Sequence, residues 1–260
     1  MIRPVRLYGD PVLRRRARPV TDFDQELRAL VADMIETMID ADGLGLAAPQ
    51  IGVSRRVFVV AGAAEAEPAR TEPGDTPGET DTGPVPADAD RVQTDPDGAG
   101  VTTDVNGAAS MGAGDRVGGT PAGQVGGAPS GEDPEEQRRR ALVFINPSFE
   151  AARGRQVGIE GCLSLPGLFH EAIGRHGALR VRYQDLDGVW HEREAEGRFA
   201  VVLQHEADHL DGVLFIDRLE PKERFAFMDE HRADLAQMQR DAKAALRQAD
   251  GTTAHASERT

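Results

Sequence analysis

Two histidines and a glutamate near residue 205 have the types and spacing of a hydrolytic metal site. The segment QHEADHLDG contains His205, Glu206 and His209, so the histidines are four residues apart. Residues four apart share one face of a helix, and His-Glu-x-x-His is the spacing by which two imidazoles bind one divalent ion. The glutamate then lies beside a water molecule on that ion. The pattern therefore predicts metal-assisted hydrolysis.

A third ligand has to come from elsewhere in the chain. Cys162, in the segment EGCLSLPG, is the only cysteine, and a thiolate is a strong ligand for zinc or ferrous iron. A lone cysteine is otherwise most often a small buried apolar residue. A carboxylate such as Glu220 or Glu223 is the alternative third ligand, and it would make the chain a zinc endopeptidase. Replacing Cys162 with alanine separates the two, because only the first predicts loss of tight metal binding.

The segment GLGLAAPQIG at 43–52 is a second candidate for a site. It is too rich in glycine and proline to predict a regular element. Its glycines would let the backbone approach a ligand closely, and Gln50 offers a side-chain amide donor. A helix terminator followed by a tight turn is the structural alternative.

Hydrophobic spacing predicts the elements that position these residues. A first helix over 27–38 has apolar residues at helical intervals, with Thr21, Asp22 or Asp24 as its cap. A second helix, 198–210, turns both histidines toward the core. A third helix covers 221–247, with an apolar stripe that begins at Phe225. The predicted strands are 57–60, 142–145 (ended by Asn146 and Pro147), 179–183 and 189–195, the last two forming a hairpin.

One segment has a different composition from the rest. Residues 61–137 contain 15 Gly and 9 Pro, and no Ile, Leu, Phe, Trp or Tyr. They also hold 16 acidic and 3 basic residues, whereas the rest of the chain has 27 basic and 28 acidic residues. Such a segment cannot bury enough apolar surface to offset the entropy lost on ordering. We therefore expect a disordered acidic insertion over 61–140, and a disordered tail over 248–260.

The remaining residues predict one catalytic domain formed by 1–60 and 141–247. Its expected fold class is α+β, with small, mostly antiparallel sheets around a central metal-binding helix and with N-terminal and C-terminal helices. A single cysteine excludes an internal disulfide framework and suits a reducing compartment, so we expect a cytoplasmic protein. No apolar run is long enough to cross a bilayer, and we expect neither a membrane nor a DNA partner.

The three segments GLGLAAPQIG, EGCLSLPG and QHEADHLDG occur in the order that is typical of one enzyme family. With YGDPVLR near the start and LFIDRLEP after the second histidine, the chain resembles the bacterial-type peptide deformylases over roughly 1–60 and 141–235. That family removes the formyl group from N-formyl-methionyl polypeptides. The long acidic insertion is not part of the family pattern.

The resemblance implies a role for each motif residue. It implies that Glu206 is the general base and acid, and that Gly45 lies beside the substrate main chain. It places the Gln50 amide and the Leu163 backbone N–H at the developing oxyanion. The implied metal ligands are Cys162, His205 and His209.

The resemblance also raises expectations about the metal and the surroundings of the site. Ferrous iron is the expected metal in the cell, whereas Zn²⁺, Ni²⁺ or Co²⁺ could occupy isolated protein. Glu160 is expected to form a buried pair with an arginine, for which Arg175 is the best candidate. Phe169 and His170, the latter expected in a solvated loop, stand where some deformylases have an arginine that touches the peptide.

A transient ribosome contact through the C-terminal helix is a further expectation from the family. Residues 222–247 contain six basic and five acidic residues, so the electrostatic case for RNA binding by this helix is weak. A catalytically silent, ribosome-binding paralogue is the remaining alternative function. It is disfavoured because every catalytic position matches the family pattern.

Overall fold

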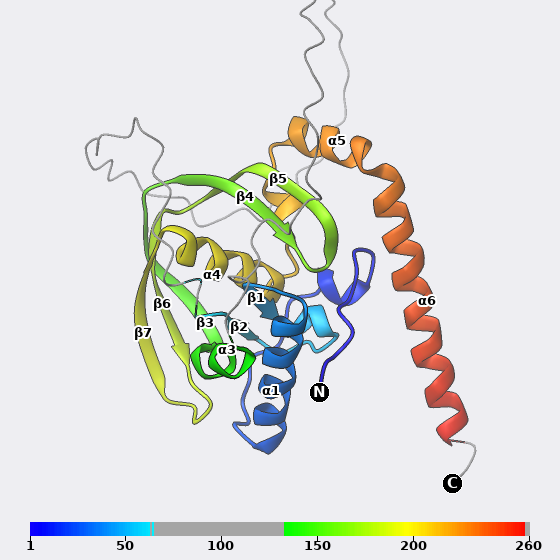
Figure 1. The fold of residues 1–260 in the computed structure, drawn as a ribbon, viewed down its shortest axis with the longest axis horizontal. Helices are drawn as coiled ribbons and strands as arrows, with labels where there is room; N and C mark the ends of the chain where they lie inside the picture. The colour runs from blue at the N-terminus through cyan, green and yellow to red at the C-terminus, as the bar shows by residue number, and fades with distance from the viewer. Residues whose placement is uncertain (63, 65–132, 258–260) are drawn as a thin grey trace, which may run out of the picture. The chain divides into compact units, whose positions relative to one another are not determined.

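The computed structural model describes residues 1–62, 64 and 133–257, with side chains as far as Gln248 (Figure 1). The helical elements in chain order are η1 (Pro11–Arg14), α1 (Gln25–Asp40), η2 (Ala48–Ile51), α3 (Pro134–Arg140), α4 (Gly197–Leu210), η3 (Phe215–Arg218), α5 (Pro221–Glu230) and α6 (Arg232–Ser257). The strands are β1 (Gly45–Ala47), β2 (Val57–Val60), β3 (Leu142–Arg153), β4 (Gln156–Cys162), β5 (Leu165–Arg175), β6 (Ala178–Gln184) and β7 (Trp190–Glu196). None of the described helices is both long enough and apolar enough to cross a lipid bilayer.

Two antiparallel sheets surround one helix, as the sequence predicted. The first sheet has the order β1-β2-β3-β6-β7, and the second is the pair β4-β5. Helix α4 packs against β1, β2, β6 and β7, and Figure 1 shows it inside the curve that the strands form. Its apolar side pairs Ala200 and Leu203 with the buried rings of Phe58 and Phe144 from the first sheet. The expected α+β class with a central helix is confirmed.

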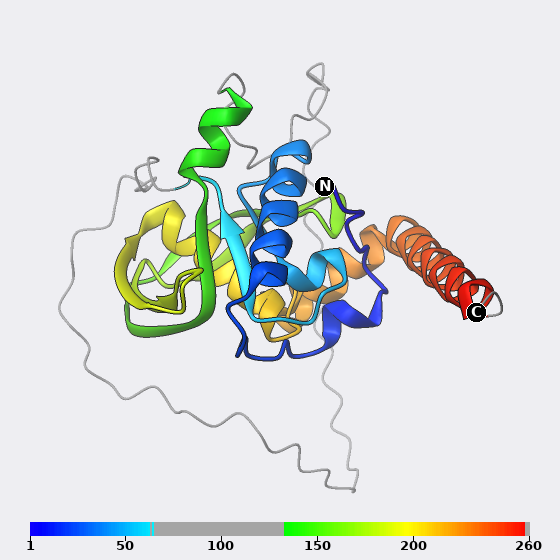
Figure 2. The ribbon, with the colours of Figure 1, turned by 90° about the horizontal axis from the view of Figure 1, so that it is seen from below.

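Helix α1 covers the other side of β1 and β2 and follows its predicted pattern (Figure 2). Asp24 is the cap, because its side chain accepts a hydrogen bond from the Leu27 backbone N–H at 2.9 Å. The apolar face of the helix, including Met34 and Met38, is almost completely buried against Val57 and Val59 of β2. Burial of this face fixes β2, which pairs with β1 and so positions Gly45.

Strand β3 is longer than predicted, and Asn146 explains the difference. Asn146 has a φ of 49°, and the register of β3 against β6 shifts between Ile145 and Ser148. The Asn146 side chain accepts from the Val20 N–H at 2.8 Å and donates to Val20 O at 2.8 Å and to Oε1 of Gln184 at 2.7 Å. These bonds hold a bulge in place, so the strand bends and continues where the sequence suggested an end.

The glycine-rich segment 43–52 is regular, contrary to the prediction. Gly45 pairs with Val60 as the first residue of β1, and η2 follows directly. Gly52 ends η2 in the left-handed region at φ 83°, where a side chain would be strained. The segment therefore forms a short edge strand and one helical turn, which together fix the position of Gln50.

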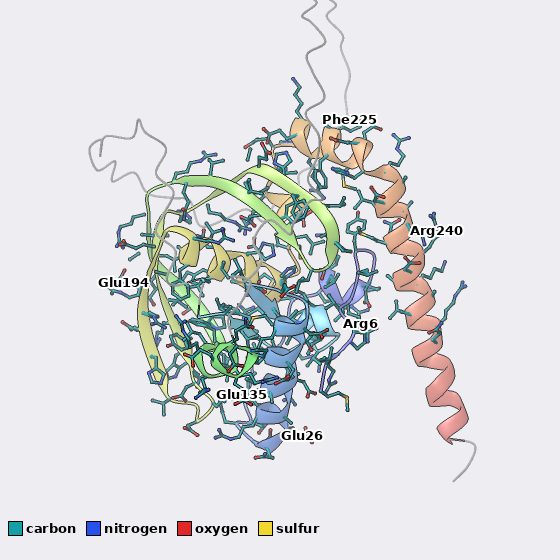
Figure 3. All side chains as sticks on the ribbon, in the orientation of Figure 1. Arg6, Glu26, Glu135, Glu194, Phe225 and Arg240 are labelled. Atoms are coloured by element: carbon teal, nitrogen blue, oxygen red, sulfur yellow. The ribbon has the colours of Figure 1, made fainter. Side chains whose placement is uncertain are left out.

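The C-terminal region forms two helices where one was predicted. Helix α5 ends at Glu230, and the ring of His231 packs against Phe227 with a centroid distance of 4.5 Å. Phe225 does not belong to a buried stripe, because 74% of it is exposed (Figure 3). Helix α6 continues to Ser257, since no proline interrupts it, and this extends beyond the boundary predicted for the tail. Residues 258–260 lie outside the described residues.

Most of the predicted insertion, including residues 65–132, lies outside the described residues, so its disorder stays a prediction. The last part of the range 61–140 is α3, which corrects the predicted boundary. Asp133 caps α3 by accepting from the Glu135 N–H at 3.1 Å, and Arg138 donates to Glu36 of α1 at 3.0 Å. The low apolar content of 61–137 indicated no helix, although Asp133, Pro134 and Glu135 carry the local signals of a helix start.

Candidate metal centre

The structure brings Cys162, His205 and His209 together. Cys162 is the last residue of β4, and the two histidines lie one turn apart on the face of α4 that meets it. One ligand atom from each residue lies within 4.8 Å of the other two. The Cys162 Sγ is 3.2 Å from Nε2 of His209, and the two imidazole centroids are 5.0 Å apart. Within the part of the chain that the structure describes, no other such group of possible ligands occurs.

The donor set suits a divalent transition metal. One thiolate and two imidazoles are ligands that zinc and ferrous iron accept, and three protein ligands leave a position for water. Nδ1 of His209 and Oε2 of Glu206 are buried without a hydrogen-bond partner among the described residues. Glu220 and Glu223, the alternative third ligands, are exposed and lie outside this group.

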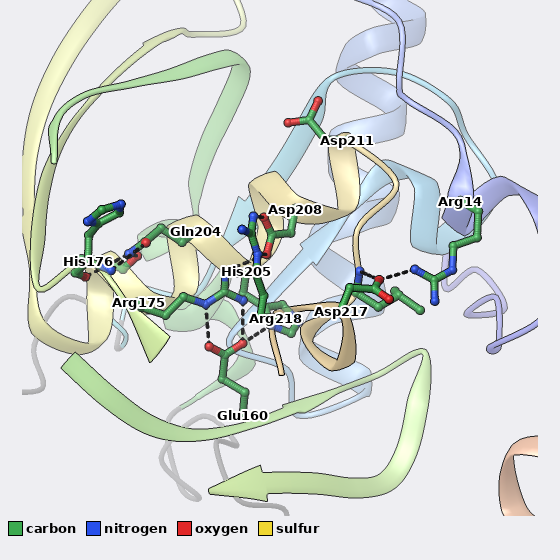
Figure 4. A network of polar contacts seen from close by, with 12 residues as sticks. Arg14, Glu160, Arg175, His176, Gln204, His205, Asp208, Asp211, Asp217 and Arg218 are labelled. Carbon is green, nitrogen blue, oxygen red and sulfur yellow. Dashed lines mark hydrogen bonds and ion pairs between the residues drawn. The ribbon is translucent and has the colours of Figure 1, made fainter. Parts of the chain in front are cut away.

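Glu160 holds the first histidine in place from behind (Figure 4). Its Oε2 is 2.8 Å from Nδ1 of His205, which leaves the other ring nitrogen for a metal. Arg175 donates to both carboxylate oxygens of Glu160, at 2.7 and 2.9 Å. Burial by itself would raise the pKa of Glu160, but its bonds to Arg175 and His205 outweigh burial and lower the pKa to about 2. The expected pairing of Glu160 with Arg175 is present.

The same network extends to two residues that the sequence analysis missed. Arg175 also donates to Oδ2 of Asp208 at 2.6 Å, and Arg218 donates to the same oxygen at 3.0 Å and to Oδ1. Arg175 and Asp208 are almost completely buried, whereas Arg218 is half exposed. Asp208 lies inside the His-Glu-x-x-His motif and Arg218 inside LFIDRLEP, so their positions were visible but their partners were not. The network places two carboxylates against two guanidinium groups behind His205.

Glu206 lies on α4 next to the ligand group and points into the protein. It is 3% exposed, and burial raises the pKa of its carboxyl to about 7. A carboxyl with this pKa can both take up and release a proton near neutral pH. Its neighbour is Gly45 of β1, where a Cβ would lie 2.7 Å from Cδ of Glu206. A side chain at position 45 would therefore displace the carboxylate.

The two histidines titrate in opposite directions. Burial lowers the pKa of His209 well below the usual range, and nearby charges on His205 and Arg175 lower it further. For His205, burial also acts to lower the pKa, but the thiol of Cys162 and the carboxylate of Glu160 raise it well above the usual range. The anionic groups that favour a proton on His205 also favour a bound cation at the same place.

Gln50 is buried on η2 with its amide held in a defined orientation. Its Oε1 accepts from the Ala47 N–H at 2.8 Å, which turns Nε2 toward the thiol of Cys162 at 3.5 Å. Ser164, which the sequence analysis missed, has its Oγ 3.4 Å from the same Nε2. Leu163 follows Cys162 directly in the turn between β4 and β5. An amide donor and the start of this turn thus both lie beside the ligand group.

The segment around His170 differs from its expected form. His170 lies in β5 and its ring packs near Phe227 at a centroid distance of 5.9 Å, so the prediction of a solvated loop histidine was wrong. Phe169 packs over Gly161 of β4, where a Cβ would come within 2.7 Å of Cε1 of the ring. A strand pair therefore presents an aromatic ring next to the residue that precedes Cys162.

The family model and the similar sequences all point to one enzyme family. The family model described as "Polypeptide deformylase" matches residues 2–78 and 127–225. The chain is similar to a peptide deformylase of Thermus thermophilus, with 38% identity over 251 residues that cover 95% of this chain and 98% of the relative. It is also similar to a peptide deformylase of Acidothermus cellulolyticus, with 36% identity over 86% of this chain and 82% of the relative.

Crystal structures of peptide deformylases have a fold similar to that of this chain. The crystal structure of the Thermus thermophilus peptide deformylase matches with a TM-score of 0.63 and 36% identity, and covers 93% of this chain and 99% of that one. The crystal structure of peptide deformylase from Thermotoga maritima matches with a TM-score of 0.54 and 32% identity, covering 85% and 99%. The gap in the family match, residues 79–126, falls within the range that the sequence identified as an insertion.

Proposed function

The chain belongs to the polypeptide deformylase family, and from that premise we propose that it removes the N-formyl group from new polypeptides that begin with formyl-methionine. Its activity is that of a peptide deformylase, a metal-dependent hydrolase. The observation that carries the proposal is the group of Cys162, His205 and His209 with Glu206 buried beside it. An endopeptidase would not need Cys162 in this group.

We propose that Cys162, His205 and His209 bind the metal as ligands. A divalent ion in this site would lower the pKa of a water molecule and polarise the formyl carbonyl. Ferrous iron is our proposal for the cell, since the resemblance to the family favours it over the ligand preference alone. Zn²⁺, Ni²⁺ and Co²⁺ suit the same donors and could occupy isolated protein.

Glu206 would move the proton. Water attacks the formyl carbon, Glu206 takes up a proton from that water, and it delivers a proton to the amine nitrogen as the C–N bond breaks. The products are formate and a polypeptide with a free amino group. The position of Glu206 supports this role, because it is buried on α4 directly after His205 of the ligand group.

Gln50 and Leu163 would stabilise the negative charge that develops on the formyl oxygen. The amide of Gln50 already has its orientation, because the Ala47 N–H and Ser164 hold it. A preorganised donor of this kind is worth roughly 3 kcal/mol in the transition state. The backbone N–H of Leu163 is the second proposed donor, at the start of the turn that follows Cys162.

Gly45 would lie beside the main chain of the substrate, as an edge residue of β1. The proposed partners are N-formyl-methionyl peptides and, transiently, the ribosome that presents them. The cytoplasm is the proposed compartment, where a single thiol ligand remains reduced.

Anaerobic purification tests the proposal. We expect the protein to contain one equivalent of a divalent transition metal and to release formate from formyl-Met peptides. The Cys162→Ala variant should lose both tight metal binding and deformylation. Retained metal in that variant, or cleavage of internal peptide bonds by the wild type, would instead support the endopeptidase. Faster inactivation of the iron form than of a nickel form by peroxide would support iron.

A further inference from the structure

Two neighbouring hollows on the surface are lined with arginines and have no part in the proposed reaction. The larger has a volume of about 710 Å³ and includes Arg16, Arg18 and Arg56 in its lining. The smaller, of about 440 Å³, includes Arg55. Arg18 and Pro19 line both hollows, which are therefore adjacent.

The backbone holds these arginines in a fixed arrangement. Two segments, 14–18 and 54–56, run parallel and are joined by the bridge between Arg18 and Arg55. The Arg18 N–H donates to Ser54 O at 3.2 Å, and the Arg56 N–H donates to Arg18 O at 2.8 Å. The Ala17 N–H donates to Leu210 O at 2.7 Å, which attaches the first segment to the end of α4. The arginines thus project from backbone that is tied to the core.

The arginines exceed the acidic groups that contact them. Asp211 is shared, at 2.7 Å from Arg56 and 3.3 Å from Arg16, and the Arg16 side chain is 81% exposed. Arg18 is exposed and has no acidic partner among the described residues, whereas Arg55 lies 3.9 Å from Glu26, and Asp22 also lines the smaller hollow. Guanidinium groups without a paired carboxylate can bind an external anion.

The hollows also have apolar walls. Pro19 lines both of them, and Pro147 and Phe149 line the larger one. The arginines line two adjacent hollows, so they suit an extended polyanion better than a single small ion. Planar guanidinium groups bind phosphates with two hydrogen bonds, and exposed bases stack on apolar rings.

We propose that this surface binds single-stranded RNA, with phosphates on Arg16 and Arg18 and bases against the exposed Pro19 and the partly buried Phe149. The surface lies apart from the metal site: Figure 4 shows Asp211 just beyond the last turn of α4, away from Glu160 and Arg175. The proposal is independent of catalysis, so deformylation of short formyl peptides reports only that the variants are folded.

The test uses the full chain and a short fluorescent RNA of mixed sequence, with anisotropy measured over a range of salt concentrations. The variant R16Q/R18Q removes two exposed charges from this surface, and R240Q/R247Q removes two from α6, on which Figure 3 labels Arg240. If both arginines contact phosphate, the first variant should reduce the slope of log K against log salt by about 1.4 and weaken binding. The second variant should bind like the wild type.

Other results would overturn the proposal. Failure of the wild type to bind RNA at low salt would do so, and so would equal weakening in both variants, because the site would then not be this surface. Displacement of the RNA by polyglutamate at equal charge concentration would indicate a surface for acidic proteins instead. Unchanged melting temperature and peptide deformylation in R16Q/R18Q would exclude misfolding as the cause of weaker binding.

Discussion

The carboxylate of Glu206 on α4 lies against the backbone of Gly45 on β1, so closely that a Cβ on Gly45 would be 2.7 Å from Cδ of Glu206. Helix α4 and the edge strand β1 therefore approach so closely here that no side chain fits at position 45. Only glycine fills position 45 without moving the group that we propose to transfer the proton.

Replacing Gly45 with alanine should reduce kcat by at least about a hundredfold, the scale of general acid-base catalysis, because the carboxylate must move. The metal content should stay the same, since no ligand changes. The control is Gly158→Ala in β4, where a Cβ would meet nothing within 4 Å. Comparable activity in G45A and G158A would show that the carboxylate tolerates displacement.

Glu206→Gln should retain the metal and lose turnover by at least about a hundredfold, because the side chain keeps its volume but no longer exchanges a proton. Metal analysis and single-turnover formate release on the same sample measure both effects. Glu171→Gln, a change at an exposed position on β5, is the matched control. Near-normal turnover in metal-loaded E206Q would remove Glu206 from the proton transfer.

Glu160→Gln should weaken metal binding by about 10- to 100-fold, because His205 loses the carboxylate that orients it. It should also lower the free energy of unfolding by roughly 3 kcal/mol, since the buried Arg175 loses a charged partner. Competition with a chelator and denaturant titration measure the two effects. Glu194→Gln, which removes the exposed partner of Arg180, should change neither. Wild-type metal affinity in E160Q would contradict the orienting role.

Deleting residues 65–132 should leave deformylation intact. The strands on either side are already neighbours, because Val60 pairs with Leu142, and a Cβ on Gly62 would lie 2.7 Å from Arg140 O. Helix α3 should stay in the shortened chain, where Arg138 bonds to Glu36. Closing a much shorter loop should lower the entropic cost by roughly 2 kcal/mol at most. A soluble, metal-loaded deletion variant with a large fall in kcat/KM would show that the segment has a catalytic function.

Local patterns predicted the parts of this protein that depend on neighbours in sequence. The spacing of His205 and His209 and the apolar face of α1 are set by helix geometry, and both are present. Asn146 is different, because its bonds to Val20 and Gln184 override a local signal for the end of a strand. No spacing rule can anticipate bonds between residues so far apart in the chain.

The support behind the metal site was predictable only in part, for the same reason. The pairing of Glu160 with Arg175 was expected from the family resemblance, whereas Asp208 and Arg218 are joined to Arg175 only by the fold. Phe225 shows the limit for helices: its spacing fits an apolar stripe, but in α5 the buried residue is Phe227, and Phe225 lies on the exposed face.

The position of Cys162 has a practical consequence. It is the only cysteine in 260 residues, and it lies in the metal group beside His209 and the Gln50 amide. A thiol-directed label can therefore attach to this protein at one atom, which is also a proposed ligand atom. The rate of labelling, followed optically, therefore measures the fraction of a purified preparation that contains metal. The measurement needs no formylated substrate.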